Sequence, residues 1–133
     1  MYLLDTNICA YLMRGGYPSL NSKILSVPPS ELAISAVTLF ELEYGAVKAN
    51  WGSQRMEDLR LFLSAFQIIP FTERDAIVTG KIRADLVKKG LPIGSYDIQI
   101  AGQGISRNFT VVTHNTGEFS RVPGIKLEDW VEE

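Results

Sequence analysis

The chain has 133 residues, with 13 Lys and Arg against 15 Asp and Glu, so its formal net charge is −2. This length and a hydrophobic content of 46% predict one domain over residues 1–133 with a packed core, and exclude a disordered chain. A single cysteine and a single histidine exclude an internal disulfide and a metal site built from several Cys or His side chains. The acidic balance also excludes nucleic-acid binding through bulk positive charge.

The hydropathy pattern gives no support for a membrane protein or an exported one. No apolar run approaches the roughly 18 residues that a membrane span needs. The first residues lack the basic region of a secretion signal. We therefore expect a cytoplasmic protein that makes no membrane contact.

Short apolar runs alternate with segments of helical periodicity along the chain. The first run, residues 2–4, precedes helices at 8–13 and 18–27. There follow, in chain order, a strand at 32–35, helices at 36–50 and 55–66, a strand at 67–70, helices at 72–88 and 95–106, a strand at 109–113, a helical turn at 116–119 and an edge strand at 125–127. This alternation predicts the α/β class, with three layers and a central, mostly parallel sheet covered by helices on both faces.

The helix at 72–88 has the most complete local signals. Residues 72–75 have the pattern of a capping box, and Gly90 and Pro92 suit its end. Its predicted apolar stripe consists of Ala76, Gly80, Ala84 and Val87.

Small polar and acidic residues follow the strands. Asp5 ends the first strand, Glu41 lies shortly after the second, and Asp97 begins the helix at 95–106, while Glu118 lies just beyond the strand at 109–113. Ligands of parallel sheets bind outside the carboxyl ends of the strands, so these four acids are expected to meet there. Two carboxylates about 5 Å apart repel by roughly 3 kcal/mol at an effective dielectric of about 20. The group therefore requires either a counter-cation or raised pKa values. For an all-oxygen site the cation would be Mg²⁺ or Mn²⁺, and a carboxylate cage around such ions suits phosphodiester hydrolysis.

Each acid also has an ordinary structural interpretation. Asp5 suits a turn after a strand. Thr38 and Glu41 have the spacing of a capping box. Asp97 is favoured by the dipole of the helix that it begins. Glu118 suits a solvated surface, so position alone leaves both interpretations open.

The single histidine and the single cysteine are each explained by a structural role. A lone histidine, His114, is more often structural or exposed than catalytic. Cys9 is expected to be a small core residue.

Two glutamates compete for a role on the helix at 36–50. The predicted apolar stripe of this helix consists of Ala36, Leu39, Phe40 and Val47. Glu43 projects into this stripe, whereas Glu41 projects away from it. A glutamate in a packed stripe is costly unless it is paired. Glu43 is therefore paired, placed at a subunit interface, or a sign that the stripe is wrong, and periodicity does not choose between the two acids.

The residues resemble, in order, the motifs of the PIN-domain family, in particular the VapC-type ribonuclease toxins of type II toxin–antitoxin systems. The matching segments are LLDTN at 3–7, SAVTLFELEYG at 35–45, RADL at 83–86, GLPIGSYDIQIA at 90–101, THNTGEF at 113–119 and LEDW at 127–130. Each segment alone is weak, but the ordered set is specific and covers nearly the whole chain. The family's glutamate precedes a Leu-x-x-Gly step, so the resemblance implies Glu41 and leaves Glu43 outside the site.

The resemblance implies a PIN-like fold and a metal-dependent endoribonuclease with Mg²⁺ or Mn²⁺ as cofactor. Its catalytic acids would be Asp5, Glu41, Asp97 and Glu118. The metal ligands would be Asp5 and Asp97, helped by Glu41, while Glu118 would serve a second metal position or the attacking water. The implied supporting polar residues are Thr6, Asn7, Ser35, Thr113 and Asn115. Candidate RNA contacts are Arg14, Lys81 and Arg83.

Similar toxins are homodimers held inactive by a cognate VapB-type antitoxin. The resemblance therefore implies both partners, and a structured RNA substrate with initiator tRNA as one candidate. His114 stands where many relatives have asparagine, so its role stays open.

Two other functions compete with this interpretation. A non-catalytic PIN domain that binds RNA or protein predicts a broken acidic set, and the set here is complete. A receiver domain predicts adjacent acids after the first strand and a lysine after the last core strand. Here Asp5 is followed by Thr6, and the strand at 109–113 runs into His114, so the receiver interpretation is disfavoured.

Overall fold

The computed structural model describes residues 1–131, which form a five-stranded parallel sheet between two groups of helices. Every neighbouring pair of strands is parallel, and the strand order is β3-β2-β1-β4-β5. The strands are β1 (Tyr2–Leu4), β2 (Leu32–Ser35), β3 (Gln67–Ile69), β4 (Thr110–Val112) and β5 (Lys126–Glu128). The expected α/β class is confirmed, and the sheet is wholly rather than mostly parallel.

Two core clusters, one on each face of the sheet, hold the layers together. Successive side chains of a strand point to opposite faces. Leu4 therefore packs in one cluster, and its neighbour Leu3 packs in the other. Both side chains are fully buried, which contributes about 1.5–3 kcal/mol for each leucine. This burial on both faces explains why β1 is an uninterrupted apolar run.

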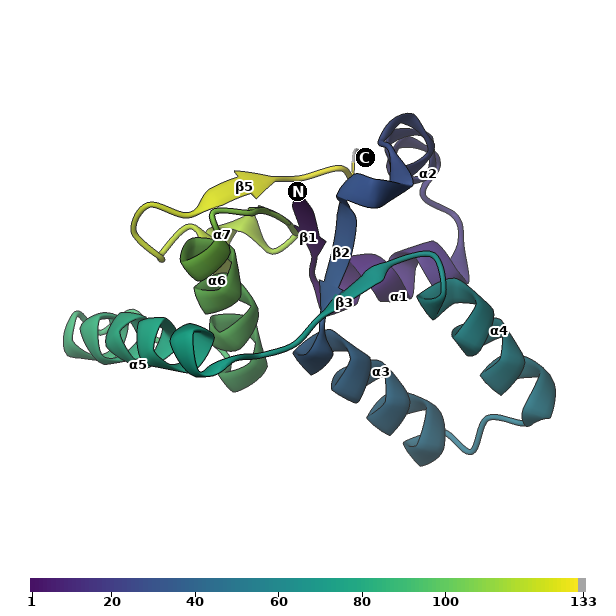
Figure 1. Ribbon diagram of the computed structural model, residues 1–133, viewed down its shortest axis with the longest axis horizontal. Helices are drawn as coiled ribbons and strands as arrows, with labels where there is room; N and C mark the ends of the chain where they lie inside the picture. The colour runs from purple at the N-terminus through teal and green to yellow at the C-terminus, as the bar shows by residue number, and fades with distance from the viewer. Residues whose placement is uncertain (132–133) are drawn as a thin grey trace.

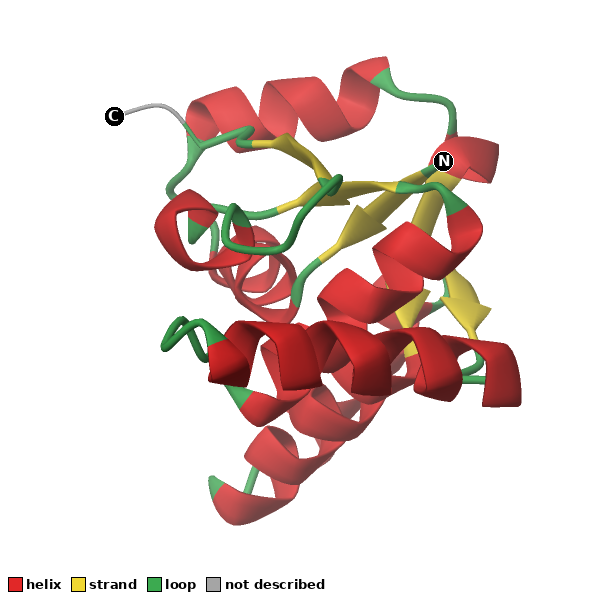
Figure 2. Cartoon of the chain, turned by 90° about the vertical axis from the view of Figure 1, so that its left-hand side faces the viewer, coloured by secondary structure: helices red, strands yellow, loops and turns green. Residues whose placement is uncertain are grey.

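The helices divide between these two faces (Figures 1 and 2). Helices α1 (Thr6–Arg14), α2 (Pro18–Ser26) and α4 (Ser53–Leu63) contribute to the Leu4 cluster. Helices α5 (Glu73–Lys88), α6 (Ser95–Arg107) and α7 (Thr116–Phe119) contribute to the Leu3 cluster. Helix α3 (Ala36–Lys48) directly follows β2 and contributes to both. None of the helices in residues 1–131 has the length and apolarity needed to cross a membrane.

The kinds and order of these elements agree with the sequence-based prediction, while several boundaries differ by two or three residues. Helix α1 begins at Thr6 rather than at residue 8, because the Asp5 side chain accepts a hydrogen bond from the backbone N–H of Ile8 and caps the helix. Helix α5 has the predicted capping box, formed by Thr72 and Asp75. A short 3₁₀ turn, Pro29–Glu31, was not predicted.

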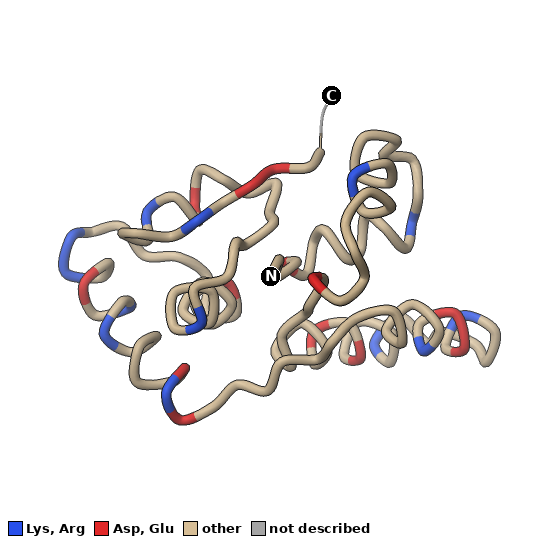
Figure 3. The backbone as a smooth tube through the Cα atoms, turned by 45° about the horizontal axis from the view of Figure 1, so that its top comes forward, with Lys and Arg blue, Asp and Glu red and all other residues tan. Residues whose placement is uncertain are grey.

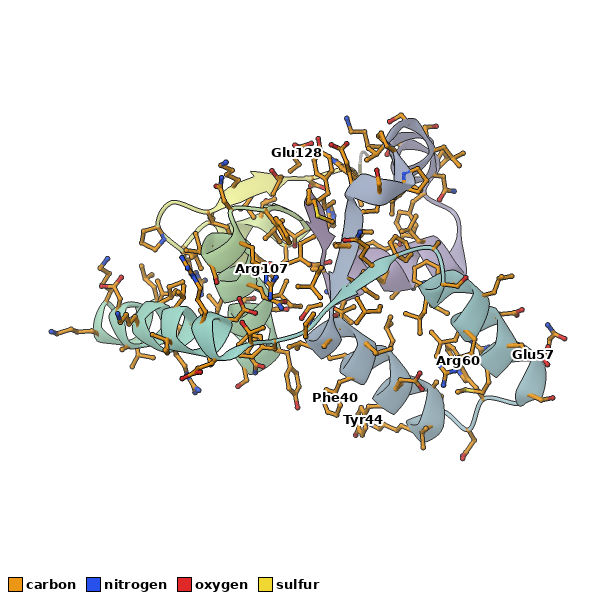
Figure 4. All side chains as sticks on the ribbon, viewed as in Figure 1. Phe40, Tyr44, Glu57, Arg60, Arg107 and Glu128 are labelled. Carbon is orange, nitrogen blue, oxygen red and sulfur yellow. The ribbon has the colours of Figure 1, made fainter. Side chains whose placement is uncertain are left out.

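The predicted apolar stripe of α5 is wrong. Ala76, Gly80, Ala84 and Val87 are all exposed, whereas Asp75, Thr79 and Leu86 are buried. Asp75 tolerates burial because α6 supplies donors to it, whereas the buried Thr79 hydroxyl has no hydrogen-bond partner among the described residues and packs against the backbone of α6. A Cβ placed on Gly102 would lie 1.9 Å from the Thr79 hydroxyl oxygen. Asp75 accepts a hydrogen bond from Arg107 at 3.1 Å, and this arginine is labelled in Figure 4.

The predicted stripe of α3 is also wrong, and this resolves the position of Glu43. Phe40 and Val47 are exposed, while Val37 and Thr38 are buried. Glu43 forms an ion pair with Arg60 of α4, which points toward α3 in Figure 4. Glu43 is therefore a paired residue between two helices.

Candidate active site

The carboxyl ends of the central strands bring the predicted acids together. The backbone N–H of Asp5 donates to Val112 of β4, and that of Thr113 donates to Glu128 of β5. Asp5 and Thr113 therefore directly follow the carboxyl ends of two adjacent strands, β1 and β4, and lie side by side. Helix α1 begins directly after Asp5, and helices α3, α6 and α7 supply the remaining acids, Glu41, Asp97 and Glu118.

Asp5 lies at the bottom of the site, and only 2% of its surface is exposed. Its Oδ1 accepts from the Ile8 N–H at 2.8 Å, and its Oδ2 accepts from the Thr113 hydroxyl at 2.6 Å. Burial raises the pKa of Asp5 above its ordinary value, and the charges of Glu41 and Asp129 act in the same direction. The two hydrogen bonds oppose this rise because they stabilise the ionised form.

Glu41 joins α3 to the start of α1. The Thr6 hydroxyl donates to Glu41 Oε1 at 2.7 Å and lies 3.1 Å from the Thr38 hydroxyl. Position 41 lies one helical turn after Thr38, so the buried start of α3 directs this glutamate toward the site. The structure thus brings Glu41 rather than Glu43 to the other acids.

Asp97 carries the clearest electrostatic signature of the group. Burial and the negative charges of Glu118, Asp5 and Glu41 raise its pKa to about 6. Burial is the larger cause, and the neighbouring carboxylates add to it because like charges disfavour the ionised form.

Glu118 is held more firmly than a solvated surface acid. Its Oε1 accepts from the backbone N–H of Gly94 at 2.6 Å, and its Oε2 accepts from Asn115 Nδ2 at 2.8 Å. These bonds lower the pKa of Glu118, the Gly94 bond most strongly. A Cβ on Gly94 would lie 3.6 Å from Asp97 Oδ2 and 3.7 Å from Glu118 Oε1, so Gly94 lies between the two carboxylates.

Three of the five predicted supporting residues donate hydrogen bonds to the acids, and the other two, Ser35 and Asn7, do not. Thr6, Thr113 and Asn115 donate to Glu41, Asp5 and Glu118 respectively. Ser35 is buried and accepts from the Val37 N–H at 3.0 Å, so it caps α3 and does not touch an acid. Asn7 lies exposed in the first turn of α1.

Gly94 and Asp129 contact residues of the site, and the sequence alone did not predict either of them. Gly94 acts through its backbone N–H, for which the sequence carries no side-chain signal. Asp129 lies 3.0 Å from His114 Nδ1 through its Oδ2, and this contact joins the ends of β4 and β5. Only the three-dimensional pairing of these two strands reveals it.

The three candidate RNA contacts are separated. Arg14 lines a groove of about 420 Å³ together with Glu41, between α1, α3 and α4. Lys81 and Arg83 are exposed on α5, on the opposite face of the sheet from α1. Figure 3 shows Lys and Arg spread over the outer helices rather than gathered in one patch.

Within residues 1–131, no three His, Cys, Asp or Glu side chains form a ready-made metal site. Each of Asp5, Glu41 and Glu118 is instead held by its own hydroxyl, amide or backbone donor. The arrangement can offer a cation several carboxylate oxygens as ligands, at a place where negative charge is in excess.

Comparison with known proteins agrees with this geometry. The PIN domain family matches residues 2–125. The chain is 39% identical, over 97% of each chain, to the tRNA(fMet)-specific endonuclease VapC of Salmonella typhimurium. It is 40% identical to ribonuclease VapC2 of Rickettsia felis, over 98% of each chain. The crystal structure of VapBC2 from Rickettsia felis bound to a DNA fragment from their promoter superposes with a TM-score of 0.90, at 38% identity, over 97% of this chain and 98% of the other.

The chain belongs to the PIN-domain family, as a VapC-type ribonuclease toxin of VapBC toxin–antitoxin systems. The endoribonuclease activity expected from the resemblance is thereby confirmed. The alternative of a non-catalytic PIN domain is not supported, because the relatives are ribonucleases and the four acids of this chain lie together.

Proposed function

We propose that this VapC-type toxin hydrolyses structured RNA with Mg²⁺ or Mn²⁺ bound by Asp5, Asp97 and Glu41, and with Glu118 at the edge of the site. The observation that carries the proposal is the gathering of the four acids, where burial first and then the repulsion of Glu118, Asp5 and Glu41 raise the pKa of Asp97 to about 6. A divalent cation removes that repulsion, and all-oxygen ligands suit these two ions.

Each acid would have a separate part. Asp5, which two hydrogen bonds hold in place, would bind the metal together with Asp97 and Glu41. Glu118 is held by the Gly94 N–H and by Asn115, and from that position it would serve a second metal position or hold the attacking water. The bound metal would supply an acidic water and stabilise charge on the scissile phosphate. In-line attack by water on phosphorus that breaks the bond to the 3′ oxygen would leave a 5′-phosphate on one fragment and a 3′-hydroxyl on the other.

The hydroxyl donors would keep the carboxylates oriented. Thr113 and Thr6 each donate to one acid, which leaves the remaining lone pairs of that acid for a ligand. Asn115 and the Gly94 N–H would do the same for Glu118. Ser35 would act one step further away by capping α3. The basic residues Arg14, Lys81 and Arg83 are proposed as contacts with the RNA backbone.

Initiator tRNA is the proposed substrate. Two curated relatives that are 39% and 37% identical to this chain are named tRNA(fMet)-specific endonucleases. Because recognition depends on surface side chains that differ between relatives, the target has to be measured on this protein.

The cognate antitoxin is proposed to occupy the groove beside the acids. Related toxins are solved as VapBC complexes. The groove is lined by apolar residues from α1, α3 and the loop after α3 and by Arg55 and Asp58 of α4, and it reaches Glu41, so a segment bound there would lie against the site. An apolar helix with a basic side chain aimed at Glu41 fits this surface. We place both partners in the cytoplasm, where tRNA and promoter DNA are found.

A homodimer is proposed from the exposed apolar side chains of α3 and α5. Phe40, Tyr44 and Val47 are 51%, 57% and 69% exposed, and Ile77 and Val87 are 54% and 57% exposed. Phe40 and Tyr44 point away from the sheet in Figure 4. Exposed apolar side chains gathered in this way are typical of an interface.

The direct test is incubation of the purified toxin with initiator tRNA and, separately, elongator methionine tRNA. We expect cleavage of the initiator tRNA with Mg²⁺ or Mn²⁺, none with EDTA, and a 5′-phosphate on the downstream fragment. Cleavage that continues in EDTA contradicts the metal assignment. Equal cleavage of both tRNAs contradicts the proposed substrate.

A further inference from the structure

An RNA strand with its phosphate at the four acids has to leave the site in two directions. On one flank lie Phe40 and Tyr96, whose rings are 5.5 Å apart, and Phe40 belongs to the surface assigned above to a second copy. The other flank is formed by α1 and by the end of β4. It has no role in the function described so far.

Three rings and a guanidinium group gather on this second flank, and we refer to Tyr11, Tyr17, His114 and Arg14 as the Tyr11 cluster. The Tyr11 ring stacks on Tyr17, with centroids 4.6 Å apart and planes at 27°. His114 lies edge-on to Tyr11 at 6.3 Å. The Arg14 guanidinium lies 5.6 Å from the centre of the Tyr11 ring.

The Tyr11 cluster is tied to the acids through two elements. Asp5 caps α1, and Asn7, Tyr11 and Arg14 then follow on one face of that helix at i, i+4 and i+7 spacing. This stripe extends about 10 Å along the helix, at 1.5 Å per residue. His114 lies between Thr113, which donates to Asp5, and Asn115, which donates to Glu118.

The local backbone holds the rings in position before any ligand binds. Gly15 and Gly16 have φ angles of 78° and 91°, a conformation that other residues rarely adopt, and this turn brings Tyr17 back onto Tyr11. Asp129 fixes the His114 ring through Nδ1. Tyr11, Tyr17 and His114 nevertheless stay partly accessible, and Arg14 is exposed.

We propose that the Tyr11 cluster binds an unpaired base of the RNA adjacent to the scissile phosphate. Aromatic and guanidinium planes stack on unpaired bases, whereas bases in a duplex are not available for this. The proposal rests on the function proposed above. It adds that the RNA is single-stranded at the nucleotide beside the cut. An RNA base is favoured over an antitoxin segment because the three rings of the cluster, Tyr11, Tyr17 and His114, do not line the antitoxin groove, and only Arg14 borders both.

The test uses Tyr11→Ala and Tyr11→Phe, with Phe66→Ala as the matched control. Phe66 belongs to a ring pair of similar spacing, 5.0 Å, formed with Phe62 at the end of α4. Affinity for an initiator-tRNA anticodon stem-loop is measured in the Asp5→Asn background at one fixed salt concentration. We expect a loss of about 5- to 100-fold for Tyr11→Ala, and values within about twofold of the parent for Tyr11→Phe and for Phe66→Ala.

A second readout reports stacking itself. The nucleotide beside the cut is replaced by 2-aminopurine, whose fluorescence falls when it stacks. We expect quenching on binding to the Asp5→Asn protein and recovery of at least half of the lost signal with Tyr11→Ala.

The outcomes separate this proposal from the one on which it rests. A wild-type protein that cleaves neither tRNA overturns the proposed function. A wild type that cleaves RNA while Tyr11→Ala keeps the same kcat/KM and the same quenching overturns the Tyr11 cluster alone. Unchanged RNA affinity with weakened antitoxin binding assigns the cluster to the antitoxin and also overturns it.

Discussion

At the residue scale, the four acids of the site differ in how far burial and neighbouring charges oppose their ionised forms and in how many hydrogen-bond donors stabilise them. Asp5 is buried and has two donors, Glu118 has two donors near the surface, and Asp97 lies between them with the repulsion of all its neighbours. The pKa therefore rises for Asp97 and falls for Glu118, although both are carboxyl groups of one site. Two measurable consequences follow from this division.

The Thr113 hydroxyl is expected to contribute to stability through Asp5. Thr113→Val keeps the shape of the side chain and removes the donor to a buried carboxylate, which should lower the free energy of unfolding by roughly 1–3 kcal/mol. Thr110→Val, on the same strand, is the control and should change it by less than about 0.5 kcal/mol. Urea unfolding at pH 7 measures both, and equal values for the two variants contradict the assigned hydrogen bond.

Asp97 should destabilise the metal-free protein at neutral pH. Its pKa is about 6 in the folded state against an ordinary 3.8, so the stability that it contributes at low pH is lost as the pH rises from about 4 to about 6. Asp97→Asn should therefore stabilise the protein in EDTA by roughly 1–3 kcal/mol at pH 8 and by almost nothing near pH 4.

Thermal unfolding at both pH values measures this difference. The exposed acid Glu57, labelled on α4 in Figure 4, gives the control variant Glu57→Gln, which should show no such pH-dependent gain. A destabilised Asp97→Asn protein at pH 8 is the contrary result.

At the element scale, caps and apolar runs predicted which segments are helices and strands, whereas helix faces were predicted less well. On α5 the periodicity counted Ala76 and Gly80 as apolar, although the helix buries Asp75 and Thr79. Polar side chains face inward there because α6 supplies Gln103 and Arg107 as donors to Asp75. A partner on a distant segment is invisible to the periodicity of a single helix.

The close contact of α5 with α6 should depend on a single glycine. Gly102→Ala places a methyl group against Thr79, with the backbone Cα of that residue only 3.0 Å away, so α5 has to shift. We expect a loss of roughly 1–3 kcal/mol in the free energy of unfolding. Gly45→Ala on α3 meets no atom within 4 Å and should instead stabilise by about 0.5–1 kcal/mol. If chemical denaturation shows the same sign for both, the account of this contact is wrong.

At the scale of the whole molecule, the parallel sheet explains why the acids could be predicted. Residues that follow parallel strands share one edge, which groups Asp5, Glu41 and Glu118. Asp97 begins a helix that follows α5 rather than a strand, so the packing of α6 beside β4 brings it to the same edge. The resemblance to the family then indicated Glu41 rather than Glu43 as the glutamate of the site. The strand pairing that joins His114 to Asp129, and the backbone donor of Gly94, depend on contacts between segments far apart in the chain.

The exposed apolar surface of α3 and α5 should make the toxin a dimer. Light scattering after size exclusion should give about twice the chain mass of 14.8 kDa. Val47→Asp combined with Ile77→Asp should give the monomer mass. Leu61→Asp on α4, whose parent side chain is 74% exposed outside this surface, should leave the dimer intact. A monomeric wild type contradicts the proposed interface.

The most direct measurement of the central claim is the rate of initiator-tRNA cleavage in Mg²⁺ by wild type, Asp5→Asn, Asp97→Asn and Glu57→Gln. We predict cleavage by the wild type and by Glu57→Gln at the same rate. Each of the two site variants should be slower by at least about 100-fold, because each removes a charged ligand from the proposed metal site. Cleavage that survives at the wild-type rate in both Asp5→Asn and Asp97→Asn would contradict the assignment of these acids as the catalytic centre.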